Sequence, residues 1–173
     1  MKSSFILFFC CVLFSINTFA GLGAKLSLPL ELTSKKEFTV FIFMNKNCPC
    51  TKQNITYLNS LYELFDNVDF IGIHSLKNTN DSDVQNFAKD NSIPFKIIND
   101  HKLEYANLFE ANRTPQVFIT NNQNEILYIG AITDRTNPDS ASNFYLKDAL
   151  KAIKTTNTLT PREHRSLGCY ILR

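Results

Sequence analysis

Three cysteines beyond the first 20 residues have types and spacing that suit sulfur chemistry. Cys48 and Cys50 flank Pro49, and Cys169 lies close to the C-terminal end. A thiolate is a nucleophile in disulfide exchange and a ligand for soft metal ions. An odd number of cysteines does not fit a fixed framework of disulfides, because one thiol is left over. The three residues therefore predict reactive sulfur rather than structural cross-links.

Cys48 is expected at the start of a helix, because an apolar, strand-like run ends shortly before it and an amphipathic pattern starts after it. Proline is favoured at the first helical position, so Pro49 predicts that Cys48 is the N-cap. Free amides of the first turn, the helix dipole and the neighbouring Lys46 and Lys52 would favour the thiolate and lower the pKa of Cys48. We therefore expect Cys48 to be the attacking thiolate.

Three disulfide pairings remain open for this site. Positions i and i+2 of a helix point in nearly opposite directions, so a bond from Cys48 to Cys50 would distort the first helical turn. Such a strained bond would be readily reduced. In the other two pairings, Cys48 or Cys50 joins Cys169, whose distant tail would fold back across the sheet.

The elements that position these cysteines follow the alternation of an α/β fold, with short apolar runs between longer amphipathic ones. A hairpin of two strands is expected around the polar turn at 121–124. Ser82 and Asp100 are expected to cap the second and third helices. The predicted strands are 38–43, 68–73, 94–98, 116–120 and 125–129, and the predicted helices are 51–65, 83–90, 103–109 and 143–154.

This order of elements resembles the thioredoxin fold with a βα unit inserted before the hairpin. Within that superfamily the chain resembles the redoxin (alkyl hydroperoxide reductase/thiol-specific antioxidant) group of exported proteins. The segments that carry the resemblance are NCPCT at 47–51, IPFKIIND at 93–100, RTPQVFI at 113–119, ILYIGAITDR at 126–135, YLKDAL at 145–150 and GCYI at 168–171. The resemblance implies a central mixed sheet flanked by helices.

The resemblance also implies roles for Thr114, Pro115 and Cys169. Thr114 and Pro115 precede the hairpin, where thioredoxin-like proteins have a cis proline that lies against the redox cysteines. The backbone of Thr114 would then pair with an extended substrate. The family's ending includes a cysteine at the position of Cys169, which implies that this thiol takes part in the redox cycle.

We therefore expect an exported thiol-disulfide oxidoreductase in which Cys48 attacks and Cys50 or Cys169 resolves the mixed disulfide. The expected partners are protein thiols or disulfides, together with a membrane or periplasmic reductant. Neither a cofactor nor a metal ion is expected in this mechanism.

Two alternatives use the same residues. A thiol peroxidase with an antioxidant role would attack peroxide with Cys48, and Arg113 would stabilise the bound peroxide; however, Phe41 and Asn45 stand where peroxiredoxins have proline and threonine. A Cu(I)-binding chaperone would hold the metal between Cys48, Cys50 and Cys169. The additional ligand could come from His74, His101 or His164, although each histidine alone is expected at the surface.

Residues 1–20 have the pattern of a secretory signal peptide, with Lys2 before an apolar run and Thr18 and Ala20 at the small-residue positions. We expect a periplasmic or secreted protein, or an N-terminal membrane anchor if the segment is not cleaved. No later segment is long and apolar enough to cross a bilayer. The rest divides into a lead-in at 21–37, a thioredoxin-like domain at 38–154 and a tail at 155–173.

The overall charge argues against one class of partner. The chain has 18 basic and 16 acidic residues and a formal net charge of only +2. A nucleic-acid binder normally carries a large basic excess, so no nucleic acid is expected among the partners. The proportions of 44% hydrophobic and 20% charged residues are those of a globular domain.

Overall fold

The computed structural model describes residues 20–173. The predicted signal peptide lies outside the described residues, apart from Ala20. Within 20–173, no helix has both the length and the apolar character that a membrane span requires.

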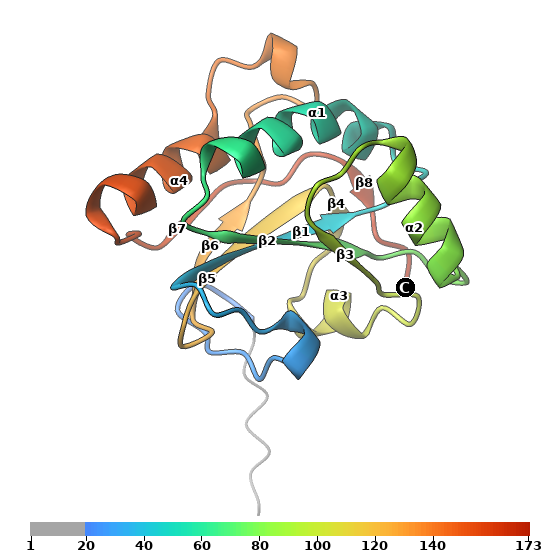
Figure 1. The fold of residues 1–173 in the computed structure, drawn as a ribbon, viewed down its shortest axis with the longest axis horizontal. Helices are drawn as coiled ribbons and strands as arrows, with labels where there is room; N and C mark the ends of the chain where they lie inside the picture. The colour runs from blue at the N-terminus through green and yellow to red at the C-terminus, as the bar shows by residue number, and fades with distance from the viewer. Residues whose placement is uncertain (1–19) are drawn as a thin grey trace, which may run out of the picture.

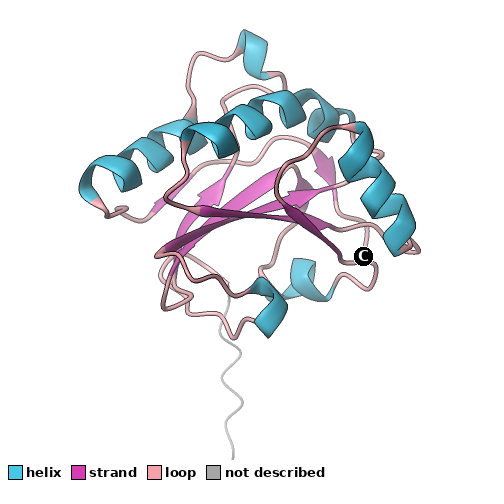
Figure 2. Cartoon of the chain, viewed as in Figure 1, coloured by secondary structure: helices cyan, strands magenta, loops and turns pink. Residues whose placement is uncertain are grey.

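The described chain contains a central set of strands with helices between them, as Figure 2 shows. The strands are β1 (Phe38–Met44), β2 (Asp69–His74), β3 (Lys96–Asn99), β4 (Arg113–Thr114), β5 (Gln116–Asn121), β6 (Ile126–Gly130), β7 (Arg162–Glu163) and β8 (Cys169–Tyr170). The helices are α1 (Pro49–Leu64), α2 (Asp81–Asp90), α3 (Glu104–Leu108) and α4 (Tyr145–Thr156), with short 3-10 turns η1 (Leu30–Leu32) and η2 (Pro138–Ser140).

The central sheet is mixed, as predicted. Its strand order is β3-β2-β1-β5-β6-β7. The pairs β1–β2, β2–β3 and β6–β7 are parallel, whereas β5 runs antiparallel to both β1 and β6. The predicted βα insertion is present as β3 and α3, which lie between α2 and the β5–β6 hairpin.

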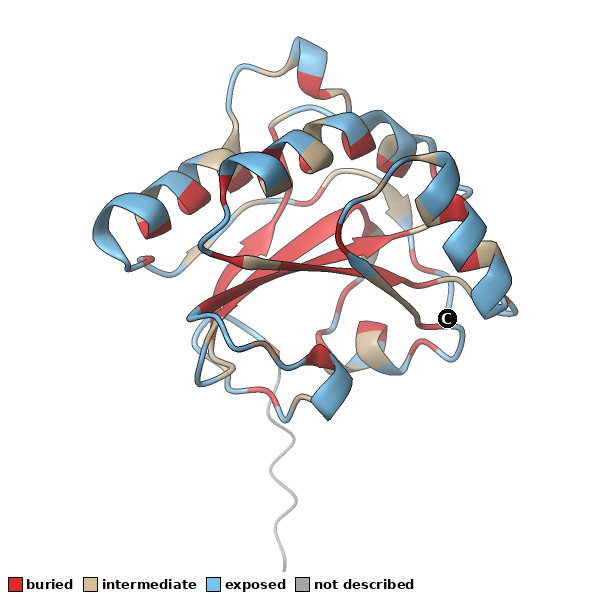
Figure 3. Cartoon of the chain, viewed as in Figure 1, coloured by how far each residue is buried: buried red, intermediate tan, exposed pale blue. Residues whose placement is uncertain are grey.

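Helices cover both faces of the sheet. Helices α1, α2 and α4 lie on one face, and α3 and η1 lie on the other (Figure 1). Alternate residues of β1 supply the two cores, since Val40 and Ile42 pack beneath α1 whereas Phe41 and Phe43 pack against Phe109 beside α3. Figure 3 shows the strands buried between helices whose outer faces are exposed. A strand covered on both faces needs the continuous apolar sequence that β1 has.

Helix α2 begins two residues earlier than predicted, and Ser82 is not its cap. Asn80 is the N-cap, and its side-chain oxygen accepts a hydrogen bond from the amide of Asp83 at 2.8 Å. The hydroxyl of Ser82 donates to the same oxygen at 2.7 Å. Both residues are good capping types, and the side chain of Asn80 reaches the third amide of the helix, which leaves Ser82 inside the first turn.

Asp100 does support the start of α3, although Leu103 is the residue at the helix boundary. The carboxylate of Asp100 accepts hydrogen bonds from the amides of Tyr105 at 3.0 Å and Ala106 at 2.9 Å, and from the hydroxyl of Ser75 at 2.8 Å. A left-handed residue at Leu103 turns the chain so that a side chain further back can reach the free amides.

The tail contains two short strands that the sequence pattern did not predict. Strand β7 joins the sheet beside β6, and β8 pairs with β4 in a separate two-stranded sheet. Each has only two residues, so neither can show a hydrophobic period. The second of these strands brings Cys169 back to the start of α1.

Candidate active site

Cys48 occupies the predicted position at the start of α1. It is the N-cap residue, and Pro49 is the first residue of the helix. The residue is only 2% exposed, because it lies where β1, α1 and the tail meet. The helix is regular from Pro49 onward, so Cys50 stands on its first turn.

The three cysteines lie together. The sulfur atoms of Cys48, Cys50 and Cys169 are all within 4.8 Å of one another. All three are free thiols, and Cys50 and Cys169 are partly exposed while Cys48 is buried. Residues from opposite ends of the domain therefore meet in one cluster, which we call the sulfur cluster.

Thr114 and Pro115 lie against this cluster. The Thr114-Pro115 peptide bond is cis, as the resemblance implied. The thiol of Cys48 donates a hydrogen bond to the carbonyl oxygen of Thr114, with a sulfur-to-oxygen distance of 3.0 Å. The hydroxyl of Thr114 is buried and has no hydrogen-bond partner.

The tail lies beside the backbone of Thr114. In the antiparallel pairing of β4 with β8, Thr114 is opposite Cys169 and Arg113 is opposite Tyr170. The strand edge that was expected to receive an extended substrate is thus paired with the C-terminal segment of the same chain.

The environment of Cys48 favours its thiolate. Burial by itself raises the pKa of this thiol, but hydrogen bonds from the side chain of Cys169 and the amide of Thr51 outweigh burial and lower the pKa to about 7. A thiol with this pKa is about half ionised at neutral pH.

The pKa values of the two neighbouring thiols are raised. Burial, reinforced by the hydrogen bond to Cys48 and its charge, raises the pKa of Cys169 to about 12. Burial and the charge of Cys48 also raise the pKa of Cys50. One thiolate in the cluster is therefore favoured at Cys48, and the other two sulfurs keep their protons and can donate to it.

Two expected supports for the thiolate differ from the structure. The neutral thiol of Cys48 points to Thr114 and makes no capping hydrogen bond, so the first turn supports the sulfur only through the amide of Thr51. The ammonium group of Lys46 forms an ion pair with Asp83 at 3.0 Å. The side chain of Lys46 is thus held beside α2 by an acidic partner, which offsets its charge.

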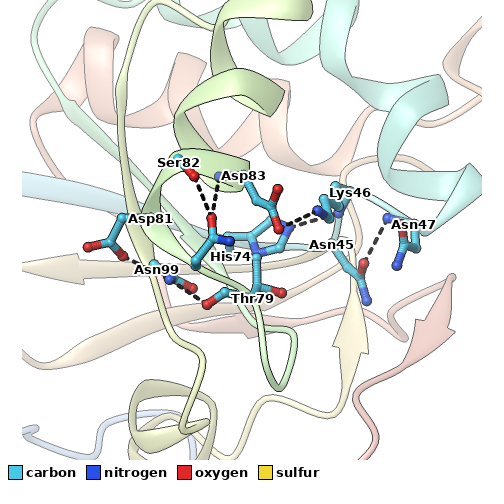
Figure 4. Close-up of polar contacts among 10 residues, drawn as sticks. Asn45, Lys46, Asn47, His74, Thr79, Asp81, Ser82, Asp83 and Asn99 are labelled. Atoms are coloured by element: carbon cyan, nitrogen blue, oxygen red, sulfur yellow. Dashed lines mark hydrogen bonds and ion pairs between the residues drawn. The ribbon is translucent and has the colours of Figure 1, made fainter.

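His74 holds the loop that leads to Cys48. Its Nε2 accepts a hydrogen bond from the amide of Lys46 at 3.0 Å. Figure 4 shows this contact beside the Lys46–Asp83 ion pair and the hydrogen bond from the amide of Asn47 to Asn45. These contacts fix the backbone between the end of β1 and the N-cap.

His74 is fully buried, so the expectation that it would lie at the surface was wrong. It ends β2, where the sheet is covered by α2 and its ring packs against Phe87. Burial, with a smaller effect from the charge of Lys46, lowers the pKa of His74 to about 4. The imidazole is neutral at pH 7 and can accept the hydrogen bond.

Asn54 anchors the first turn of α1 from one turn further on. It is buried, and its amide nitrogen donates to the carbonyl oxygens of Cys50 at 2.8 Å and Thr136 at 2.7 Å. Sequence reasoning did not single out this residue. The signal was its four-residue spacing from Leu58 on the buried face of the helix, where a polar residue needs a partner.

Arg113 does not take the role expected of it in a peroxidase. Its guanidinium group donates to the carbonyl oxygen of Gly168 at 2.8 Å and to the hydroxyl of Tyr170 at 2.7 Å. It also lies over the ring of Tyr170, 4.0 Å from the centroid. The guanidinium group of Arg113 therefore binds the tail and is not directed at Cys48.

The sulfur cluster has the ligand type for a soft metal ion. Among residues 20–173, the grouping of three sulfurs includes no histidine. His74 is held by Lys46, and His164 stacks on Tyr145 with ring centroids 3.9 Å apart. The histidines considered as additional ligands are thus engaged elsewhere or, like His101, exposed at the surface.

Comparison with known proteins places the chain in a family. A family model described as "Domain of unknown function (DUF6436)" matches residues 19–172, so the chain belongs to the DUF6436 family. No curated protein matches the chain.

Solved structures share the fold. An uncharacterized conserved protein from Geobacillus kaustophilus is similar with a TM-score of 0.76 and 22% identity, over 91% of this chain and 94% of that one. A secreted Mycobacterium tuberculosis disulfide oxidoreductase homologous to E. coli DsbE gives a TM-score of 0.51 and 16% identity, over 67% of this chain and 81% of that one. A thioredoxin-like protein from Aeropyrum pernix gives a TM-score of 0.50 and 14% identity, over 56% of this chain and 70% of that one. The fold is therefore thioredoxin-like.

Proposed function

We propose that this member of the DUF6436 family is a thiol-disulfide oxidoreductase that uses Cys48 as its nucleophile. The observation that carries the proposal is the cluster of three sulfurs within 4.8 Å of one another at the start of α1. The lowered pKa of Cys48, about 7, supports its choice as the attacking group.

The proposed exchange has two steps. The Cys48 thiolate attacks one sulfur of a substrate disulfide, so that a mixed disulfide forms and the other substrate sulfur leaves as a thiolate. A second protein thiol then loses its proton, attacks Cys48 and releases the remaining substrate sulfur. The substrate gains two electrons and becomes two thiols, while two protein cysteines become a disulfide. The reverse sequence oxidises a dithiol.

We assign the second step to Cys169 rather than Cys50. The pairing of Thr114 with Cys169 brings this thiol to Cys48 from a separate strand, and the two sulfur atoms lie within 4.8 Å of each other. Cys50 belongs to the regular first turn of α1, which a bond to Cys48 would distort.

We further propose that the protein acts outside the cytoplasm. The signal-peptide pattern at 1–20 supports export, and an oxidising compartment is where a protein with reversible disulfides would meet its partners. Protein thiols or disulfides, and a membrane or periplasmic reductant, are the proposed partners. We also propose that the exported chain has three parts. These are a lead-in at 21–37, a thioredoxin-like domain at 38–154 and a tail at 155–173.

Serine variants test the assignment. Cys48→Ser should lower the rate of disulfide exchange with a small aromatic disulfide by about 100-fold or more, because a serine hydroxyl cannot replace the thiolate. Cys50→Ser should keep the wild-type rate of the first step. A wild-type rate in Cys48→Ser would overturn the proposal, as would a loss of reaction in Cys50→Ser alone.

A second candidate function is Cu(I) binding, which the same grouping of three sulfurs favours. Three thiolates are suited to a soft monovalent ion, which accepts low coordination numbers. Binding would release the thiol protons of Cys50 and Cys169, so affinity should rise with pH.

Copper titration separates the two candidates. The reduced protein should be titrated with Cu(I) against a coloured chelator that holds free metal at low nanomolar concentration. One tightly held ion per chain, lost in both Cys50→Ser and Cys169→Ser, would support the metal function. A protein that leaves all copper with the chelator while reacting with disulfides would exclude it.

A further inference from the structure

The C-terminal segment 167–173, which we call the tail strand, lies along the edge of β4. Strands β4 and β8 run side by side in Figure 1, and Thr114 and Cys169 are direct partners. The pairing extends beyond β8, since the amide of Ile171 donates to the carbonyl oxygen of Asn112 at 3.0 Å. The tail strand is thus bound in an extended conformation beside the cis proline.

Arg113 holds the residues on both sides of Cys169. Its guanidinium group donates to the carbonyl oxygen of Gly168 and to the hydroxyl of Tyr170, and it stacks over the Tyr170 ring. Tyr170 is nevertheless 64% exposed, so the ring is held mainly by Arg113 and not by the core. This contact selects an aromatic residue directly after the cysteine.

Gly168 fits where no larger residue would. Its φ of 145° lies in the region that favours glycine. A Cβ at this position would lie 2.8 Å from the carbonyl carbon of Thr114 and closer still to its oxygen. The edge of β4 therefore selects glycine directly before the cysteine.

Two contacts beyond the cysteine complete the binding. Ile171 is only 6% exposed and packs in the core beside α3. The guanidinium group of Arg173 donates to the carbonyl oxygen of Ala111 at 2.7 Å and to the side chain of Asn107 at 2.9 Å. The segment is thus recognised at successive positions, as a bound peptide is.

We propose that the tail strand is a resident peptide ligand, and that the polypeptides with which Cys48 exchanges displace it and carry the same local pattern of glycine, cysteine and aromatic residue. The proposal rests on the proposed function, because it names the partner of that site. In this proposal, Cys169 occupies the position beside Cys48 that the cysteine of a bound substrate would take. Exchange with such a polypeptide is then limited by the fraction of molecules in which the tail strand has left.

Gly168→Ala tests this inference in the full chain. The added methyl group would clash with Thr114 and unseat the tail strand. The reduced protein is mixed with a peptide of the sequence 166–173 whose cysteine carries a thionitrobenzoate disulfide, and release of thionitrobenzoate is timed at a pH of about 9.5, where Cys48 is ionised whether or not Cys169 donates to it. We expect the variant to react at least about tenfold faster than wild type, since the competing strand no longer fills the edge.

Two controls give the result its meaning. Gly21→Ala is the matched glycine variant, since a Cβ there would meet nothing within 4 Å, and it should react like wild type. For a peptide of the same composition in scrambled order, the rate of reaction with Cys48 should increase much less in Gly168→Ala. An equal gain for both peptides would overturn the proposal, because the tail strand would then act only as a cover. Unchanged rates in the variant would also overturn it.

Tyr170→Ala provides a second variant in case Gly168→Ala does not fold. Tyr170 is mostly exposed, and its loss removes only the contacts with Arg113. The same selective gain for the 166–173 peptide is expected, and an unselective gain or none would contradict the proposal. The proposed function is checked separately by the reaction of wild-type Cys48 with a small aromatic disulfide. If that reaction occurs but the peptides are not distinguished, the proposed function stands and the inference about the tail strand fails.

Discussion

The thiol of Cys48 donates to the carbonyl oxygen of Thr114 across 3.0 Å, although the two residues are 66 positions apart in the chain. This contact needs the proton of the neutral thiol. When Cys48 ionises, the sulfur can no longer donate, and the carbonyl of Thr114 becomes available as an acceptor. Formation of the nucleophile and release of a backbone acceptor beside it are therefore linked.

Alkylation of Cys48 should depend on pH with a midpoint near 7. The pKa of about 7 means that the thiolate, and with it the rate, rises through neutral pH and levels off above it. In Cys169→Ala the donor to the thiolate is lost, so the midpoint should move toward the ordinary thiol value of about 8.5. The rate of reaction with iodoacetamide from pH 5 to 10 measures the midpoint in the wild-type protein and in Cys169→Ala. A midpoint that is the same in the two proteins would contradict the role given to Cys169.

Asn54→Ala should destabilise the protein by about 1 to 3 kcal/mol, because the carbonyl oxygens of Cys50 and Thr136 lose a buried donor. Urea unfolding measures the change. Asn86→Ala is the matched control, since Asn86 is exposed on α2 and should change stability by less than about 0.5 kcal/mol. Equal effects of the two substitutions would contradict the anchoring role of Asn54.

His74 should make the fold sensitive to acid. Because its folded pKa of about 4 lies below the ordinary value, the unfolded chain binds a proton between pH 6.5 and 4 that the folded protein does not. Stability is therefore lost as pH falls through this window, by up to about 3 kcal/mol. Urea unfolding at several pH values should show a smaller loss in His74→Gln than in wild type.

The control for His74 is His101→Gln, which replaces an exposed histidine and should keep the wild-type dependence on pH. The comparison removes the contribution of other buried groups, such as Asp100, whose pKa is raised by burial and whose effect on stability has the opposite sign. If the two histidine variants lose stability equally on acidification, the neutral buried state of His74 is wrong.

Local sequence was sufficient to predict the start of α1. Pro49 after a short apolar run predicts a strand, a loop and a helix, and each of these depends on neighbouring residues only. The structure has Cys48 at the predicted N-cap. Alternation of apolar runs likewise predicts the order of the central elements, since a strand buried on both faces must be apolar throughout.

Contacts formed across the fold could not be predicted in this way. The tail strand has no hydrophobic period, and its place depends on Gly168 fitting against Thr114 and on Arg113 reaching Tyr170. The expected role of Cys169 came from a family resemblance rather than from spacing. His74 was missed as a buried residue because its environment is set by α2, a separate element of the chain.

Trapping of the mixed disulfide shows whether Cys48 is the nucleophile. A double variant with Cys50→Ser and Cys169→Ser retains Cys48 but lacks both thiols that could resolve the intermediate. After reaction with a small aromatic disulfide and digestion under non-reducing conditions, mass spectrometry should find the adduct on Cys48 in nearly every molecule. A double variant that stays unmodified at Cys48, under conditions in which wild type is oxidised, would contradict the account.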